Sequence, residues 1–170
     1  SLRNEEKKVK EFVDEFISCL SNKNKLIFCG NGGSAADSVH IAGEYVGRFQ
    51  SERQSLPAIS LAADISSLTA IGNDYGFEYI FSRQIEGLAN NGDILVSLST
   101  SGNSQNILNA VKRANSLGIK TLSLSGKGGG LLNQLSYKCI IIKSNSTARI
   151  QEAHKFILHY ICSKVDEYFC

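Results

Sequence analysis

Apolar residues follow two kinds of spacing along the 170-residue chain. Between Glu5 and Leu20 they recur every three or four residues, which predicts an amphipathic helix. Later in the chain, short apolar runs predict five buried strands, at Lys25–Cys29, Pro57–Leu61, Asp93–Leu98, Lys120–Leu124 and Lys138–Ile142. Helices are predicted between and after them, at Ser34 to about Phe49, from near Asp64, from near Phe77, at Ser104 to about Ser116, in a short stretch before Lys138, and from about Thr147.

Strands that alternate with helices predict a parallel sheet covered by helices on both faces. The predicted fold class is therefore a doubly wound α/β three-layer sandwich of about five strands. We expect residues 25–170 to form this domain and residues 1–24 to form an N-terminal helical segment. Ligands of such sheets bind beyond the carboxyl ends of the strands, where loops lead into helices.

The loop after the first strand, Gly30–Ser34, is rich in glycine. Glycines let the backbone approach an anion, and the start of the next helix offers unpaired N–H groups. Ser34 and Asp37 carry the spacing of a helix N-cap. The loop is also consistent with a tight turn, or with a loose dinucleotide fingerprint ending at Ala35. A dinucleotide-dependent oxidoreductase would need an acidic residue about 20 positions on, and Asp64 comes too late.

The loop after the third strand, Ser99–Ser104, carries four hydroxyl groups, on Ser99, Thr100, Ser101 and Ser104. Hydroxyls at a strand-to-helix turn can donate hydrogen bonds to phosphate oxygens. The alternative is a polar turn that ends in an ordinary helix cap at Ser104. Two such loops on one sheet favour a phosphate site.

All three histidines of the chain lie on two helices that begin at loops on the ligand side of the sheet. His40 and Glu44 lie four apart, hence on one helix face, where they could chelate zinc or divide acid and base roles. A surface pair at helical spacing is the simpler interpretation. The last helix carries Gln151, His154 and His159, and His154 alone is equally consistent with a structural histidine.

Composition narrows the function classes. The chain has 18 Lys and Arg against 16 Asp and Glu, and these charges are scattered, which argues against nucleic acid as a partner. Five cysteines without metal-type spacing predict reduced, mostly buried thiols. No stretch approaches the apolar length of a membrane span, so we expect a cytoplasmic protein without membrane partners.

Four motifs in order carry a resemblance to a known family. They are C-G-N-G-G-S-A-A-D at Cys29–Asp37, G-N-D-Y-G-F at Gly72–Phe77, S-T-S-G-N-S at Ser99–Ser104 and R-I-Q-E-A-H at Arg149–His154. From Lys25 onward the chain resembles the phosphoheptose isomerases of the SIS (sugar isomerase) fold. The resemblance implies conversion of D-sedoheptulose 7-phosphate to D-glycero-D-manno-heptose 7-phosphate through an enediol, the first step of ADP-heptose supply for the lipopolysaccharide core.

The resemblance also implies roles for single residues. It makes Glu44 and His159 the acid–base pair, and it makes a Zn²⁺ site of His40, Glu44, Gln151 and His159. The implied substrate contacts are Asn31, Gly32, Gly33, Glu44, Asn73, Asp74, Ser99, Thr100, Ser101, Ser104 and Gln151. Taken alone, Asn73 and Asp74 are typical of a turn after the helix that follows the second strand.

The family suggests a homotetramer, and helix geometry bears on whether its sites are shared. Gln151 and His159 are separated by a rise of roughly 12 Å in a regular helix, too far for one metal ion. Either Gln151 lies in an irregular first turn, or a neighbouring subunit supplies one of the two. We expect shared sites, because the last helix offers an apolar surface that suits a subunit interface: Ile150, Phe156, Ile157, Tyr160, Ile161 and Val165.

A non-catalytic SIS regulator, like the relative that binds the replication initiator DnaA, is the alternative function. Such relatives resemble isomerases that have lost the acid–base pair. Glu44 and His159 are both present here, which favours the enzyme.

Overall fold

A computed structural model describes residues 5–170 and contains one parallel sheet. Its strands are β1 (Leu26–Gly30), β2 (Ala58–Ser60), β3 (Ile94–Ser99), β4 (Lys120–Gly126) and β5 (Lys138–Ile142). They are ordered β2-β1-β3-β4-β5, and β1 pairs with β3 from Leu26 opposite Ile94 to Gly30 opposite Leu98. The predicted doubly wound sandwich of five strands is confirmed.

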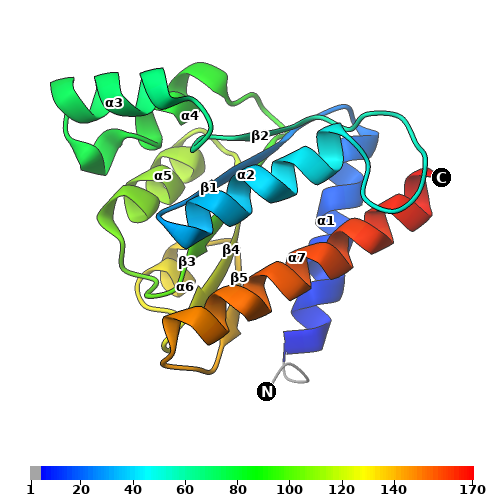
Figure 1. Cartoon of the computed structure of the whole chain (residues 1–170). Coiled ribbons are helices and arrows are strands. Elements are labelled where there is room, and N and C mark those ends of the chain that lie inside the picture. The colour runs from blue at the N-terminus through cyan, green and yellow to red at the C-terminus, as the bar shows by residue number, and fades with distance from the viewer. Residues whose placement is uncertain (1–4) are drawn as a thin grey trace.

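Helices cover both faces of this sheet (Figure 1). One face carries α1 (Glu6–Ser21), α2 (Gly33–Val46) and α7 (Thr147–Phe169); the other carries α3 (Ile65–Asp74), the short 3-10 helix η2 (Phe77–Tyr79), α4 (Ser82–Leu88), α5 (Gln105–Ser116) and α6 (Leu132–Leu135). Successive strand residues point to opposite faces. Phe28 therefore packs in the first core and its neighbour Ile27 in the second.

The two helices that matter most for function, α2 and α7, run side by side from the same edge of the sheet (Figure 1). Asp37 on α2 forms an ion pair of 2.9 Å with Lys155 on α7. One turn further along, His40 on α2 meets His159 on α7. Successive turns of α2 thus contact successive turns of α7, and both helices begin at the carboxyl ends of the strands.

The strand order places a topological switch between β1 and β3. From β1 the chain moves outward to β2, whereas β3 leads to β4 and β5 on the other side. The loops after β1 and β3 therefore diverge, and the crevice between them is where open α/β sheets bind ligands. These are the glycine loop and the serine loop singled out from the sequence.

Several local predictions differ from the structure. Ser34 is a buried residue inside α2 and not its cap; the N-cap is Gly32, whose φ of 55° suits glycine. The helix ends at Val46, before Phe49. Asn73 and Asp74 are the last residues of α3 and do not lie in a loop after it.

The cysteines agree with a further expectation. Within residues 5–170, all five cysteines are free, and only Cys170 is exposed. None of the helices in this described part combines the length and the apolar character that crossing a membrane requires.

Candidate active site

The glycine loop, the serine loop and the first turn of α7 line one pocket. We call it the loop pocket, and its lining is Asn31, Gly32, Gly33, Ser34, Leu98, Ser99, Thr100, Ser104, Thr147 and Gln151. Residues from three distant parts of the sequence meet there because β1, β3 and α7 all reach the same edge of the sheet. The structure thus places in one pocket Gln151 and most of the substrate-binding residues predicted in the two loops.

Hydroxyl groups of the serine loop are arranged around the start of α5. Ser99 is buried, and its Oγ accepts a hydrogen bond of 3.1 Å from the Gly102 N–H. Ser104 is the N-cap of α5, yet its side chain makes no capping hydrogen bond to any described residue. The Ser104 hydroxyl is therefore available to bind a ligand. This weakens the alternative interpretation of the serine loop as a polar turn that ends in an ordinary helix cap.

Ser101 behaves differently from its neighbours. Its Oγ accepts a hydrogen bond of 3.2 Å from the Asn103 N–H, which stabilises the turn. Among residues 5–170, the loop-pocket lining does not include Ser101. Within this chain the structure thus separates Ser101 from the other three hydroxyls.

Two close contacts shape the glycine loop. A Cβ on Gly33 would lie 2.7 Å from the Nε2 atom of Gln151, so the absence of a side chain lets Gln151 approach the loop. The Asn31 and Asn106 amides exchange two hydrogen bonds of 2.8 Å each. Asn106, a buried residue in the first turn of α5, thereby holds the glycine loop against the helix that follows the serine loop. Sequence analysis missed Asn106, because a polar residue on the inner face of a helix has no distinctive motif.

A second group of side chains lies further along α2 and α7. The Nε2 atom of His40 is 3.2 Å from Glu44 Oε1 and 3.0 Å from His159 Nε2. One ligand atom from each of the three residues lies within 4.8 Å of the others. The Phe49 ring stacks on His159 with ring centroids 5.3 Å apart. We call His40, Glu44 and His159 the His–Glu cluster.

The cluster has the chemistry of a metal or proton-transfer site. Burial, and then the neighbouring His40, lower the pKa of His159 below its ordinary value of 6.5, so its imidazole is neutral at pH 7. Neutral imidazole and carboxylate are zinc ligands, and tetrahedral zinc holds its ligand atoms about 3.4 Å apart. The two separations from His40, 3.2 Å to Glu44 and 3.0 Å to His159, are close to that value, so these residues fit a zinc ion with small adjustments.

The loop pocket and the His–Glu cluster are two separate centres within one chain. Gln151 lies beside Gly33, whereas His159 follows eight residues later, a rise of roughly 12 Å. His40 is seven residues beyond Gly33 on α2, roughly 10 Å along that helix. Of the four residues implied as zinc ligands, three gather and Gln151 belongs to the pocket.

Asn73 and Asp74 lie apart from both centres in this chain. Both are exposed, and the Asn73 amide donates a hydrogen bond of 2.9 Å to Asp74. The nearby residues that do reach the loops are Phe77 and Glu78, which share a hollow with Asn31 and Ser104.

His154 is buried between α7 and β4. Its Nε2 lies 3.1 Å from the Ser125 carbonyl oxygen, so this nitrogen carries the proton and donates it. The Ser125 hydroxyl in turn donates to the Ser99 carbonyl oxygen at 3.0 Å. Burial lowers the pKa of His154. This arrangement favours the structural interpretation, in which His154 supports the serine loop from behind.

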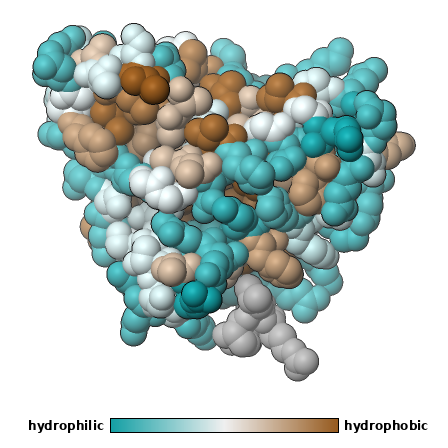
Figure 2. Space-filling model, in the orientation of Figure 1, coloured by the Kyte–Doolittle hydropathy of each residue, from teal (hydrophilic) through white to brown (hydrophobic). Residues whose placement is uncertain are grey.

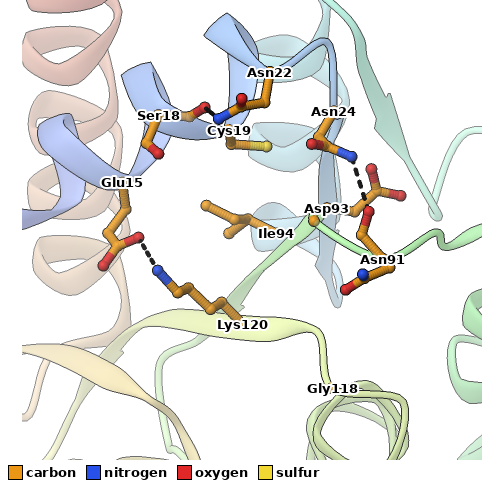
Figure 3. Close-up of a pocket in the computed structure, with 11 residues that line it drawn as sticks. Glu15, Ser18, Cys19, Asn22, Asn24, Asn91, Asp93, Ile94, Gly118 and Lys120 are labelled. Carbon is orange, nitrogen blue, oxygen red and sulfur yellow. Dashed lines mark hydrogen bonds and ion pairs between the residues drawn. The ribbon is translucent and has the colours of Figure 1, made fainter.

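A further hollow lies at the opposite end of the sheet (Figure 3). There Lys120 pairs with Glu15 at 2.6 Å, and the Asn24 amide donates to the Asn91 carbonyl oxygen at 3.0 Å. Asp93 accepts hydrogen bonds from the backbone N–H groups of Lys25 and Asn90. These polar groups are satisfied by one another, so the hollow offers no obvious chemistry.

Comparison with known proteins defines the class first. The family model of the SIS domain matches residues 1–126 of the chain. This agrees with the parallel five-stranded sheet and with phosphate-type loops at its switch point.

Closer relatives are phosphoheptose isomerases. The chain is 57% identical to the phosphoheptose isomerase of Campylobacter concisus (strain 13826) over 150 residues, covering 88% of this chain and 79% of that protein. It is 47% identical to that of Helicobacter pylori (strain P12), covering 99% and 88%. The chain belongs to the phosphoheptose isomerase family of SIS domain proteins.

Solved structures agree. The phosphoheptose isomerase GmhA from Neisseria gonorrhoeae superposes with a TM-score of 0.88 at 40% identity, and the enzyme from Francisella tularensis with 0.90 at 38% identity. Each match covers 94% of this chain and 85% of the other. All four of these relatives are named phosphoheptose isomerases, and their names lend no support to the regulatory alternative.

Proposed function

We propose that the protein isomerises D-sedoheptulose 7-phosphate to D-glycero-D-manno-heptose 7-phosphate. One observation carries this proposal: the loop pocket and the His–Glu cluster lie roughly 10 Å apart along α2. That separation is comparable to an extended seven-carbon sugar phosphate, whose phosphate and reacting carbons are at opposite ends. The relatives named phosphoheptose isomerase support the same substrate.

The loop pocket would hold the phosphate. Hydroxyls of Ser99, Thr100 and Ser104 can donate to its oxygens, and the start of α2 adds backbone N–H groups at Gly32 and Gly33. Hydrogen bonds to a charged phosphate are stronger than those between neutral groups. Phosphate binding at one end positions the reacting carbons at the other. The resemblance also assigns Ser101, Asn73 and Asp74 to the substrate, and alanine variants would test each of these.

The His–Glu cluster would carry out the proton transfers. Glu44 removes a proton from C1, and His159 donates one to the carbonyl oxygen at C2, which gives the enediol. The proton then returns to C2 while His159 takes one back from the C1 hydroxyl. His159 suits this role because an imidazole titrates near neutral pH, so its protonated form can donate the proton and its neutral form can take one back.

Zinc is part of the proposal. His40, Glu44 and His159 would hold the ion, and Gln151 is the fourth ligand implied by the family. When bound, the ion would supply Lewis-acid polarisation of the carbonyl. An activity assay on sedoheptulose 7-phosphate, with and without a chelator, tests both the reaction and the need for metal.

We further propose a homotetramer with shared sites, although the apolar interface expected on α7 is only partly present. Ile150, Ile157, Ile161 and Val165 are buried within the chain, where α7 packs on α1 and the sheet. Phe156 and Tyr160 of α7 remain exposed, at 65% and 41%, and further exposed apolar surface lies elsewhere. Figure 2 shows apolar residues on the face over α2 and α3, where a groove is lined by residues including Val39, Val46, Ile59, Ile71 and Leu88.

The structure brings Glu44 and His159 together in one chain, so a shared site would involve Gln151 of a neighbour. Mixing Glu44→Gln with Gln151→Ala protein would then restore activity, because some hybrid sites carry both native residues. No recovery after demonstrated subunit exchange would end this idea, as would a monomer in solution.

Location and pathway remain part of the same proposal. We assign the protein to the cytoplasm and its reaction to the first step of ADP-heptose supply for lipopolysaccharide. The five free thiols and the family membership support this assignment. Loss of heptose from lipopolysaccharide on deletion of the gene would test it.

A further inference from the structure

A buried ion pair joins the end of α7 to the segment that follows α2. The Nε atom of Arg53 is 2.7 Å from Asp166 Oδ1, and the side chains are only 1% and 3% exposed. Neither residue lines the loop pocket or belongs to the His–Glu cluster. Burying two charges is costly unless the remaining donors and acceptors also find partners.

Arg53 finds those partners at the C-terminal end of α2. Its guanidinium donates to the carbonyl oxygens of Glu44 at 2.8 Å and Tyr45 at 3.0 Å, and also to Gln54 at 3.0 Å. The last carbonyls of a helix have no partners within it, and they form the negative end of its dipole. Arg53 therefore caps α2 at the turn that carries Glu44.

Asp166 fixes the segment just beyond that turn. Its Oδ2 accepts hydrogen bonds from the N–H groups of Gln50 at 2.9 Å and Ser51 at 3.1 Å. Burial opposes ionisation, but the hydrogen bonds from Gln50, Arg53 and Ser51 outweigh it and lower the pKa of Asp166. The residue before Gln50 is Phe49, whose ring stacks on His159.

The ion pair thus connects to both catalytic residues of the His–Glu cluster, Glu44 on α2 and His159 on α7, through the backbone of their helices. Arg53 holds the backbone of Glu44, and Asp166 lies seven residues beyond His159, about two turns along the same helix. We infer that Arg53 and Asp166 are positioning residues that set the spacing of Glu44 and His159 for proton transfer. This inference depends on the proposed isomerase function.

A purely structural ion pair would affect stability and leave the kinetics of the folded enzyme unchanged. The chain offers a matched control in Lys25 and Asp93, an ion pair with side chains 20% and 2% exposed. Asp93 also accepts two backbone N–H groups, as Asp166 does. This control pair lies at the opposite end of the sheet, beside the hollow drawn in Figure 3.

The experiment compares Arg53→Lys and Asp166→Asn with Lys25→Met and Asp93→Asn. For each variant, kcat and KM for sedoheptulose 7-phosphate are measured well below its thermal midpoint and corrected for the folded fraction. Displacements on the order of 1 Å can cost about 100-fold in rate, so we expect kcat to fall about 10- to 100-fold in the first two variants. KM should change by less than about threefold, because the loop pocket is untouched. The control variants should lose stability but keep kcat within about twofold of wild type.

A double variant separates positioning from charge burial. Arg53→Met with Asp166→Leu removes both ions, and such replacements often preserve stability. We expect a folded protein whose kcat stays low; a wild-type kcat in it, or in Arg53→Lys, would overturn the inference. If the double variant does not fold, Arg53→Lys decides. A wild-type protein without isomerase activity would instead overturn the proposed function.

Discussion

Replacing Ser99 with alanine tests the loop pocket at its most buried hydroxyl. Ser99 is 4% exposed, and its Oγ already accepts the Gly102 N–H while lying 3.4 Å from Ser104 Oγ. The Ser99 hydroxyl would therefore donate its hydrogen bond to a phosphate in the pocket. Losing one hydrogen bond to a charged group costs about 1.5–3 kcal/mol, which corresponds to a loss of about 10- to 150-fold in affinity.

The structure also ranks the hydroxyls of the serine loop. Ser104→Ala should weaken phosphate binding by a similar factor, since its hydroxyl makes no capping bond within residues 5–170. Ser101→Ala should have the smallest effect, because this side chain stabilises the turn outside the pocket lining. The family-based assignment of Ser101 to the substrate would instead give it an equal effect.

Binding can be measured without turnover by titrating the substrate into Glu44→Gln protein that carries each serine change. Inorganic phosphate serves as a second ligand, because it lacks the sugar. Loss of affinity for both ligands is the expected result. Unchanged affinity in a Ser99→Ala, Ser101→Ala double variant would remove the serine loop from the site.

Three other predictions follow from the same structure. Glu44→Gln and His159→Asn should each remove most turnover while circular dichroism stays native, and a near wild-type rate in either would refute its role. Burial lowers the pKa of His154 and His159, so the unfolded chain binds more protons below their ordinary value of 6.5. The free energy of unfolding should therefore fall as the pH drops below 6.5, less steeply in His154→Gln, and urea titrations that show no such fall would contradict this. A thiol reagent should modify Cys170 quickly and the buried thiols slowly, since burial raises the pKa of Cys29 to about 12; rapid reaction of several thiols would contradict the buried core.

The strands could be predicted from sequence because central parallel strands are buried on both faces. β1 and β3 are buried at every position, so they appear as continuous apolar runs that end where a loop begins. The positions of the glycine loop and the serine loop could therefore be predicted from the ends of these two strands. The glycine loop then determined the start of α2, although at Gly32 and not at Ser34, because a positive φ favours glycine over a serine cap.

Long-range pairs could not be predicted in this way. Arg53 and Asp166 are 113 residues apart in sequence, and Asn31 and Asn106 are 75 apart. Their pairing depends on how helices pack and not on any local pattern. Likewise, the apolar residues of α7 suggested an interface, whereas α1 and the sheet bury most of them. His40 and Glu44 showed a local spacing, but His159 joined them only through the family resemblance.

The most direct test of the whole account is the conversion of sedoheptulose 7-phosphate by the purified wild-type protein. Product is followed by a coupled assay or by NMR in deuterated water, with metal-free and zinc-loaded samples in parallel. The account predicts formation of the manno-heptose 7-phosphate, exchange of deuterium at C2, and loss of the reaction in Glu44→Gln. A wild-type protein that binds the substrate but neither converts it nor exchanges its protons would contradict the central claim.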